Sequence, residues 1–206
     1  MKKIRVLVAD DHAIVRMGLI ALLAIDGDIE VVGEAEDGAE AVKLAESTKP
    51  DVVIMDIMMP VMDGIDATAE IVKRVPGAKV LVLTTSNSSD DYSGALAAGA
   101  RGIVVKRAAN MELLSSIRKV ADEKTVMSPE ARRLMQEDPP APKFTDRQLG
   151  IIHSMMRGLT NHEIATQFNI TPDCVKAHIK RVCNKIGAAN RTEAVAIALR
   201  KHLLKF

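Results

Sequence analysis

The chain has 206 residues, of which 48% are hydrophobic and 27% charged, and its formal net charge is +1. This composition is typical of one or two soluble globular domains. No apolar run approaches the roughly 18 residues that a membrane-spanning helix needs, so we expect no membrane insertion and no membrane partner.

The small net charge hides an asymmetry along the chain. Residues 1–138 hold 17 lysines and arginines against 23 acids, whereas residues 139–206 hold 11 against 4. An acidic front part and a basic back part suggest two domains with different partners, and the basic one is typical of nucleic-acid binding.

The first residues, MKKIRVLVADD, combine two lysines with a short apolar run that acids follow at once. A signal peptide would have a longer apolar region and a small-residue cleavage site, so we predict a strand here. Cys174 and Cys183 lie on one predicted helix, about 13 Å apart along its axis. This spacing excludes a disulfide between them and favours a reducing, cytoplasmic location.

Short runs rich in valine and isoleucine alternate with helical spacing along the front part. The runs are Ile4–Ala9, Ile29–Val32, Val52–Met55, Val80–Leu83 and Ile103–Val105. The helical segments are His12–Ile25, Ala39–Ser47, Ile65–Arg74, Asp91–Ala98 and Met111–Val120. Such alternation predicts β-α-β units on a parallel sheet that is covered on both faces. We therefore predict an α/β doubly wound domain with a five-stranded parallel sheet over residues 1–122.

Polar residues stand where these predicted strands end. They are Asp10 and Asp11, Asp56, Thr84 and Thr85, and Lys106. The carboxyl ends of parallel strands meet at the edge of the sheet where ligands bind, so these side chains are expected to converge. A single aspartate at a strand end is usually a turn residue or a helix cap. The coincidence at four strand ends favours a site.

Three clustered carboxylates repel one another unless a cation joins them, and Mg²⁺ prefers such hard oxygen ligands. A Mg²⁺ site beside a lysine and a threonine is typical of phosphoryl transfer. A carboxylate can be the nucleophile, which gives an aspartyl phosphate.

The motifs VADD, IMDIMMPVMDG, VLVLTT and GARGIVVKR resemble the flavodoxin-like receiver domain of bacterial two-component response regulators. The resemblance implies that Asp56 accepts a phosphoryl group from a histidine kinase. Asp11, Asp56 and the backbone carbonyl of Met58 would bind Mg²⁺, with Asp10 assisting through water. Thr84 would donate a hydrogen bond to the phosphoryl group, and Lys106 would pair with it. The loop after the nucleophile would be shaped by Pro60 and Gly64.

One position departs from this pattern. Receivers usually carry an aromatic residue in the last strand, which changes rotamer together with the threonine. Ile103 stands there, and Tyr92 lies elsewhere in the sequence. We expect that the face formed by the fourth helix, fifth strand and fifth helix shifts through Thr84 alone.

Residues 123–143, EKTVMSPEARRLMQEDPPAPK, change in character and are predicted to be a linker. Ser128 and Pro129 have the form of a helix cap and a first-turn proline, which predicts a short helix over the following residues. The later prolines cannot continue a helix and favour a semi-rigid tether.

The back part, residues 144–206, is predicted to be a small all-α domain of four helices. The helices are expected at 146–157, 161–168, 172–186 and 191–203. Capping-box patterns begin at Thr145, Thr160 and Asn190, and Thr171 precedes a first-turn proline. The second and third helices, joined by a short turn, have helix-turn-helix dimensions.

The third of these helices has an apolar face and a basic face. The apolar face is expected to pack against the core and consists of Val175, Ile179, Val182 and Ile186. Lys176, Ala177, Lys180, Arg181 and Asn184 fall on the opposite side, which is where a recognition helix meets the major groove of double-stranded DNA. A basic stripe on an isolated helix is often only a solvated face. Cys174 and His178 lie four residues apart, but two ligands do not make a zinc site.

Residues 143–204 resemble the LuxR-type four-helix DNA-binding domain, with GLTNHEIA, VKAHI and NRTEAV as specific matches. Gln148 and Cys174 stand where Glu and Thr are usual. The resemblance implies groove contacts by Lys176, Ala177 and Lys180, and backbone contacts by Thr171, His178 and Arg181. A receiver joined to such a domain is the architecture of NarL/FixJ-type response regulators, which bind DNA repeats as homodimers. The last helix offers the expected dimer surface through Val195, Ala196, Leu199 and Leu203, and some of these side chains must also close the small core.

These motifs predict a transcription regulator whose dimerisation and DNA binding change when Asp56 is phosphorylated. A phosphatase of the haloacid dehalogenase type would carry a second aspartate at position 58, where Met58 stands, so we do not predict a substrate-turnover enzyme. The alternative is a phosphorylation-independent DNA-binding regulator with an atypical receiver, which Ile103 keeps open.

Overall fold

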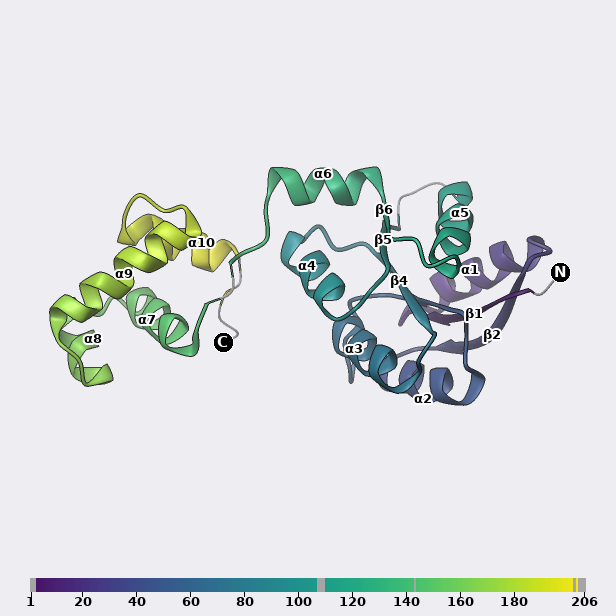
Figure 1. Ribbon diagram of the computed structural model, residues 1–206, viewed down its shortest axis with the longest axis horizontal. Helices are drawn as coiled ribbons and strands as arrows, with labels where there is room; N and C mark the ends of the chain where they lie inside the picture. Colours follow the sequence, from purple (N-terminus) through teal and green to yellow (C-terminus); the bar gives the residue numbers. More distant parts are fainter. Residues whose placement is uncertain (1–2, 107–109, 143, 202, 204–206) are drawn as a thin grey trace. The chain divides into compact units, whose positions relative to one another are not determined.

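The computed structural model describes residues 3–106, 110–142, 144–201 and 203. It divides into two compact units, Met1–Pro139 and Pro140–Phe206 (Figure 1). Each unit has its own apolar core. The units differ in architecture, because the first is built on a sheet and the second on helices alone.

In the described part of the first unit, the sheet has the strand order β2-β1-β3-β4-β5-β6, and all neighbouring pairs are parallel. The strands are Ile4–Ala9 (β1), Ile29–Ala35 (β2), Val52–Met55 (β3), Lys79–Thr84 (β4), Gly102–Val105 (β5) and Val126–Met127 (β6). Because β2 and β3 flank β1 on opposite sides, the order reverses there. The carboxyl ends of β1 and β3 therefore border the crevice in which such sheets bind ligands.

Helices cover both faces of this sheet (Figure 1). One face carries α1 (Ala13–Ile25) and α5 (Asn110–Ala121). The other face carries α2 (Gly38–Thr48), α3 (Gly64–Arg74), α4 (Ser89–Ala97) and α6 (Pro129–Glu137). β3 and β5 are buried along their whole length, and β1 and β4 are buried except at their first residues, as their continuous apolar runs require. The predicted doubly wound α/β class is confirmed.

The predicted strand count is wrong by one, and part of the predicted linker is folded. Among the described residues, β6 adds a sixth strand, in which Val126 pairs with Gly102 and Met127 with Ile103. The helix expected after Ser128 is present as α6, and the Ser128 hydroxyl accepts the N–H of Ala131. Ala131 is fully buried in the same apolar cluster as β5 and α4. Residues 126–137 thus belong to the first unit.

The described part of the second unit holds α7 (Asp146–Met156), α8 (Asn161–Phe168), α9 (Pro172–Ile186) and α10 (Arg191–Arg200). Thr145 and Thr160 form the predicted capping boxes with Gln148 and Glu163. At α10 the pattern differs, because the Glu193 carboxylate accepts the N–H of Ala189 over 2.7 Å. The last helix ends at Arg200, three residues before the predicted end.

Candidate functional sites

Two buried carboxylates and one ammonium group meet at the carboxyl edge of the sheet. Asp10 follows β1 and is 1% exposed, and Asp56 follows β3 and is 3% exposed. Lys106 follows β5, and its Nζ lies 2.6 Å from Asp56 Oδ2 and 2.6 Å from Asp10 Oδ2. The structure thus brings together side chains that are far apart in the sequence, with the lysine bridging the two acids.

The charge of Lys106 is favoured by this contact. Burial lowers the pKa of the Lys106 amine, but the hydrogen bonds to Asp10 and Asp56 outweigh burial, and the pKa lies above its ordinary value of 10.5. The ammonium therefore stays charged at neutral pH. It offsets negative charge that would otherwise be costly to bury.

A third aspartate completes an oxygen-rich cluster. Ligand atoms of Asp10, Asp11, His12 and Asp56 all lie within 4.8 Å of one another. The carboxylates suit Mg²⁺, which prefers hard oxygen ligands. His12 was not predicted to belong to the site, yet its Nδ1 lies 2.6 Å from Asp11 Oδ1.

The backbone around Asp56 is held tightly. The Asp56 N–H donates to the carbonyl of Ala9 over 2.9 Å, and the N–H of Ile57 donates to Asp56 Oδ1 over 2.8 Å. A Cβ atom on Gly64 would lie 1.8 Å from the carbonyl oxygen of Asp56, so this position requires glycine. Met58, whose carbonyl was predicted to bind metal, follows two residues after Asp56 with an exposed side chain.

A left-handed residue lies in the same loop. Val61 has φ +65°, and the N–H of Met62 donates to the carbonyl of Pro60 over 2.7 Å. This i to i+2 bond defines a tight turn whose central residue is strained, especially when it is β-branched. The Val61 side chain is 87% exposed, so its packing does not offset the strain.

Thr84 lies at the end of β4, fully buried, and its Oγ1 accepts the N–H of Ser86 over 3.1 Å. Two residues further on, the structure reveals a contact that the sequence did not indicate. The phenol of Tyr92 in α4 donates to the carbonyl of Ser86 over 2.6 Å. Tyr92 and Ile103 belong to one apolar cluster, so the aromatic ring in this region comes from α4 instead of β5.

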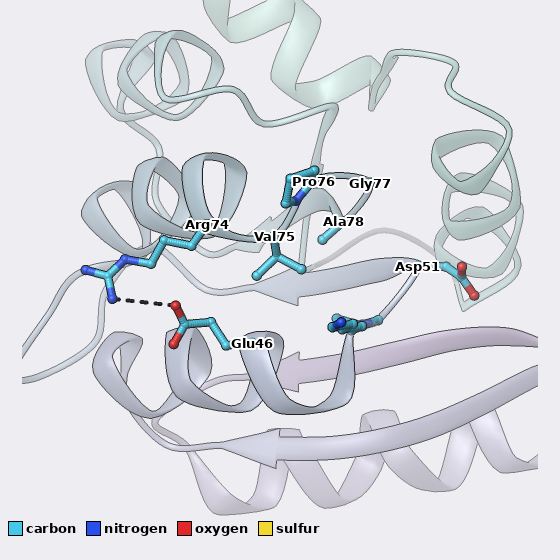
Figure 2. Close-up of a pocket in the computed structure, with 9 residues that line it drawn as sticks. Glu46, Asp51, Arg74, Val75, Pro76, Gly77 and Ala78 are labelled. Atoms are coloured by element: carbon cyan, nitrogen blue, oxygen red, sulfur yellow. Dashed lines mark ion pairs between the residues drawn. The ribbon is translucent and has the colours of Figure 1, made fainter.

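A cavity of about 650 Å³ lies at the opposite edge of the sheet and belongs to neither candidate site. It is bordered by the residues that precede β3 and β4, including Asp51 and Ala78 (Figure 2). Arg74 Nη1 lies 3.7 Å from Glu46 Oε1 across one side. Lys49 and Asp51 also line the cavity, so it does not form a site of one charge.

The second candidate site is the exposed face of α9. Val175 and Val182 are fully buried, whereas Ile179 and Ile186 are partly buried against the same core. On the other side, the predicted contact residues with exposed side chains are Thr171, Lys176, Ala177, Lys180, Arg181 and Asn184. The helix follows α8 after a turn in which Asn169 has φ +50°. This arrangement is a helix-turn-helix whose second helix presents three cations, Lys176, Lys180 and Arg181, on the predicted contact face.

Two predicted residues of α9 behave differently from the rest. His178 is half-buried, and its Nδ1 is buried without a hydrogen-bond partner among the described residues. The Thr171 hydroxyl accepts the N–H of Cys174 over 3.3 Å as the helix cap, which leaves its proton for a further acceptor. Cys174 itself is exposed.

Both halves of the chain match known families. The response regulator receiver domain matches residues 6–118, and the luxR family of bacterial regulatory proteins matches residues 142–198. The chain therefore belongs to the response regulators, and it is of the NarL/FixJ type, with a receiver domain and a LuxR-type DNA-binding domain. It is a regulator of transcription and not a metabolic enzyme.

Relatives match over nearly the full length. The transcriptional regulatory protein LiaR of Bacillus subtilis is 38% identical, over 98% of this chain and 99% of its own length. The response regulator VraR of Staphylococcus aureus is 34% identical over the same shares. The structure of the RcsB–DNA complex is similar with a TM-score of 0.71 and 25% identity, covering 97% of this chain and 99% of that chain. Nowhere in the described ranges does a helix have the length and apolar character needed to cross a membrane.

Proposed function

We propose that Asp56 is the phosphoacceptor of this response regulator and that a sensor histidine kinase is the donor. The observation that carries the proposal is the 2.6 Å contact of Lys106 Nζ with Asp56 Oδ2, inside the cluster that also holds Asp10 and Asp11. A carboxylate oxygen of Asp56 attacks phosphorus, the new O–P bond forms, and the N–P bond to the kinase histidine breaks.

Mg²⁺ would be held by Asp10, Asp11, Asp56 and the main-chain carbonyl of Met58, and it would offset the negative charge of the transferred group. Lys106 already stands against Asp56 and supplies a second positive charge on the protein side. Thr84 accepts the Ser86 N–H, so its own hydroxyl proton is the one that can be donated to a phosphoryl oxygen.

The surroundings of the acids support a protein donor. Apolar side chains are exposed in the first turns of α1 and α5 and in the loop after β3, where the carboxyl edge of the sheet lies. They are Ile14, Met17, Met58, Val61 and Met111. Exposed apolar side chains around a polar site are typical of a surface that another protein covers.

The test is the intact mass of the full chain after incubation with acetyl phosphate and Mg²⁺, for wild type and Asp56→Asn. We expect a gain of one phosphoryl group in wild type only. A gain in both proteins would place the phosphoryl group on another residue, and no gain in wild type would remove the basis of the phosphorylation switch.

For the second domain we propose sequence-specific binding of double-stranded DNA by α9. Lys176, Ala177 and Lys180 would face base edges, Thr171, His178 and Arg181 would contact phosphates, and Asn184 extends the same face. The exposure of Lys176, Lys180 and Arg181 supports this assignment. The similar RcsB structure is of a DNA complex, which supports the same mode here.

Lys176→Ala provides the test, with Lys185→Ala as the matched control on the same helix. Lys185 lies half a turn around the helix from Lys176, and its Nζ lies 5.2 Å from the centre of the Phe144 ring. We expect Lys176→Ala to weaken binding to a mixed-sequence duplex and to reduce the slope of log affinity against log salt by about one. Equal slopes for the two variants would contradict the assignment.

We further propose that phosphorylation promotes a homodimer. RcsB is described as dimers on DNA, which supports this state for a similar chain. The dimer surface expected on α10 is smaller than the sequence suggested. Val195 and Leu203 pack into the core of the second unit, whereas Ala196 and Leu199 are exposed. Sedimentation of wild type and Leu199→Asp with acetyl phosphate tests this surface.

The second candidate function is DNA binding that does not depend on phosphorylation. The observation that favours it is Ile103, an aliphatic residue fully buried in β5. DNA occupancy of wild type and Asp56→Asn in cells distinguishes the two functions. Equal occupancy supports the phosphorylation-independent regulator.

A further inference from the structure

Ser86 lies between the candidate phosphorylation site and α4, and it is bonded on both sides. Its N–H donates to Thr84 Oγ1 over 3.1 Å. Its carbonyl accepts the phenol proton of Tyr92 over 2.6 Å. Its hydroxyl donates to Asp91 Oδ2 over 2.5 Å and accepts the N–H of Ser88 over 3.2 Å. A single residue therefore joins a hydroxyl at the end of β4 to an aromatic side chain of α4.

The Tyr92 ring packs in the layer that α6 covers. It is 1% exposed and lies in one apolar cluster with Ile103 of β5 and Ala131 of α6. A cavity of about 250 Å³ separates part of α4 from α6, and Tyr92, Val105 and Leu134 line it. The packing of α6 against the first unit thus leaves a cavity, and it depends on the position of the Tyr92 ring.

Two further observations support a defined contact. Burial and the neighbouring Asp91 raise the pKa of Tyr92, so the phenol keeps its proton and remains a donor at neutral pH. The Ser89 hydroxyl donates to Asp138 Oδ2 over 3.4 Å, which ties the first turn of α4 to the end of α6. One end of the α4–α6 contact is therefore polar, and the apolar cluster that holds Tyr92 and Ala131 lies beside it.

We infer that Tyr92 is a positioning residue that acts through Ser86 on the Thr84 hydroxyl and couples the state of Asp56 to the docking of α6. The inference rests on the proposed phosphorylation of Asp56. A phosphoryl oxygen on Asp56 accepts the proton of the Thr84 hydroxyl, and the Thr84 side chain turns away from the Ser86 N–H to reach it. When that hydroxyl turns to the phosphoryl group, Ser86 loses a partner and shifts together with the Tyr92 phenol.

The direction of the coupling follows from these contacts. The unphosphorylated chain has the Ser86 bonds intact and α6 docked, so phosphorylation weakens the docking. A phosphoryl group shifts an equilibrium only through contacts that differ between the two states, and the Thr84–Ser86 bond is such a contact. Because α6 leads into Pro139 and Pro140, its release frees residues that precede the DNA-binding domain. This path uses no aromatic side chain in β5.

The test is hydrogen exchange of the full chain, followed by mass spectrometry of peptides from Pro129–Glu137. Wild type, Tyr92→Phe and Ser88→Ala are each measured with Mg²⁺, with and without acetyl phosphate. Tyr92→Phe keeps the ring and removes only the phenol. Ser88→Ala is the control, because it removes the cap of α4 and leaves the phenol bond in place. The intact mass of every sample reports whether a phosphoryl group has been added, and the Asp56→Asn comparison assigns that group to Asp56.

In wild type, we expect phosphorylation to speed exchange in α6 about fivefold, the factor that corresponds to one hydrogen bond. In unphosphorylated Tyr92→Phe, exchange in α6 should be about fivefold faster than in unphosphorylated wild type. Phosphorylation of this variant should change the exchange rate less than twofold. Ser88→Ala should keep the wild-type response to phosphorylation. The effects of phosphorylation and of Tyr92→Phe on exchange in α6 are then not additive. Non-additive effects indicate that the phenol couples the two sites, whereas a purely structural effect would be additive.

Three outcomes overturn the inference. If wild type gains a phosphoryl group and exchange in α6 does not change, the inference is wrong but the proposed function is not affected. This holds whatever the variants do. If Tyr92→Phe speeds exchange in α6 by the same factor in the phosphorylated and the unphosphorylated protein, Tyr92 has only a structural role. The absence of any adduct overturns the proposed function and the inference together, and the intact mass tells these cases apart.

Discussion

Lys106 and Asp56 are joined by a 2.6 Å hydrogen bond, and the same ammonium lies equally close to Asp10. The lysine thus occupies the space between two carboxylates that are also candidate Mg²⁺ ligands. A metal ion and this ammonium would repel each other while they share the same acids, so Lys106 competes with the metal in the absence of a phosphoryl group.

Replacement of Lys106 with Met should therefore tighten Mg²⁺ binding and slow phosphorylation. We expect the Mg²⁺ dissociation constant to fall about fivefold, because one nearby positive charge is lost. Calorimetric titration measures the affinity, and intact mass against time measures phosphorylation by acetyl phosphate. Lys106→Arg retains the charge and serves as the control. Weaker Mg²⁺ binding in Lys106→Met would mean that the lysine organises the acids instead of competing for them.

Gly64→Ala should destabilise the first unit by about 3 kcal/mol, because its Cβ would overlap the Asp56 carbonyl and the backbone must move. The Cβ would lie 1.8 Å from that oxygen. Urea unfolding measures the change, and phosphorylation should also slow because Asp56 is displaced. The matched control is Gly18→Ala in α1, where a Cβ meets nothing within 4 Å. It should stabilise by about 0.5–1 kcal/mol through helix propensity.

Val61→Gly should stabilise the protein. The valine has φ +65° and is exposed, so glycine removes backbone strain and loses little packing. Relief of strain exceeds the added entropy of the unfolded chain, and we expect about 1 kcal/mol and a rise in Tm of about 3 °C. Calorimetry measures the Tm, and Val61→Ala should gain less than Val61→Gly. A lower Tm for the glycine variant would show that this strain is absent in solution.

The cap of α8 should respond to acid. Hydrogen bonds from the backbone N–H and the hydroxyl of Thr160 hold the pKa of the Glu163 carboxyl below its ordinary value of 4.5. A carboxyl whose pKa is lower in the folded state than in the unfolded state stabilises the fold at pH values above the unfolded-state pKa. That stabilisation is lost as the pH falls through the folded-state pKa. Carbon-detected NMR titration should find the Glu163 midpoint below 4.5, and Glu163→Gln should remove this part of the acid dependence of unfolding.

The sequence predicted much of the candidate phosphorylation site because strand ends are local features. Asp10, Asp56 and Lys106 each follow a continuous apolar run, and parallel strands bring such positions to one edge. The pairing of Lys106 with Asp10 as well as Asp56 could not be predicted, since it depends on rotamers and distances. The contact of Tyr92 with Ser86 is also geometric, because a tyrosine in a helical pattern has no periodic signal for its hydroxyl partner.

The fold shows the same division. Helices with a strong cap, such as those after Ser128 and Thr160, were predicted from the residues that begin them. β6 was missed because two residues, Val126 and Met127, are too few for any periodicity. Its pairing depends on how the chain turns after α5, where Glu123 has φ +64°.

The short strand β6 also determines what the sheet offers to other molecules. Without β6, the apolar strand β5 would be the outer strand of the sheet on this side. One row of its backbone N–H and C=O groups would then have no partner strand. Such an apolar edge is a template for pairing with another chain, and so for aggregation. With β6 in place, the outermost strand on this side of the sheet is only two residues long, which is too short to recruit a further strand. The segment that resembles a linker in sequence therefore protects the solubility of the first unit.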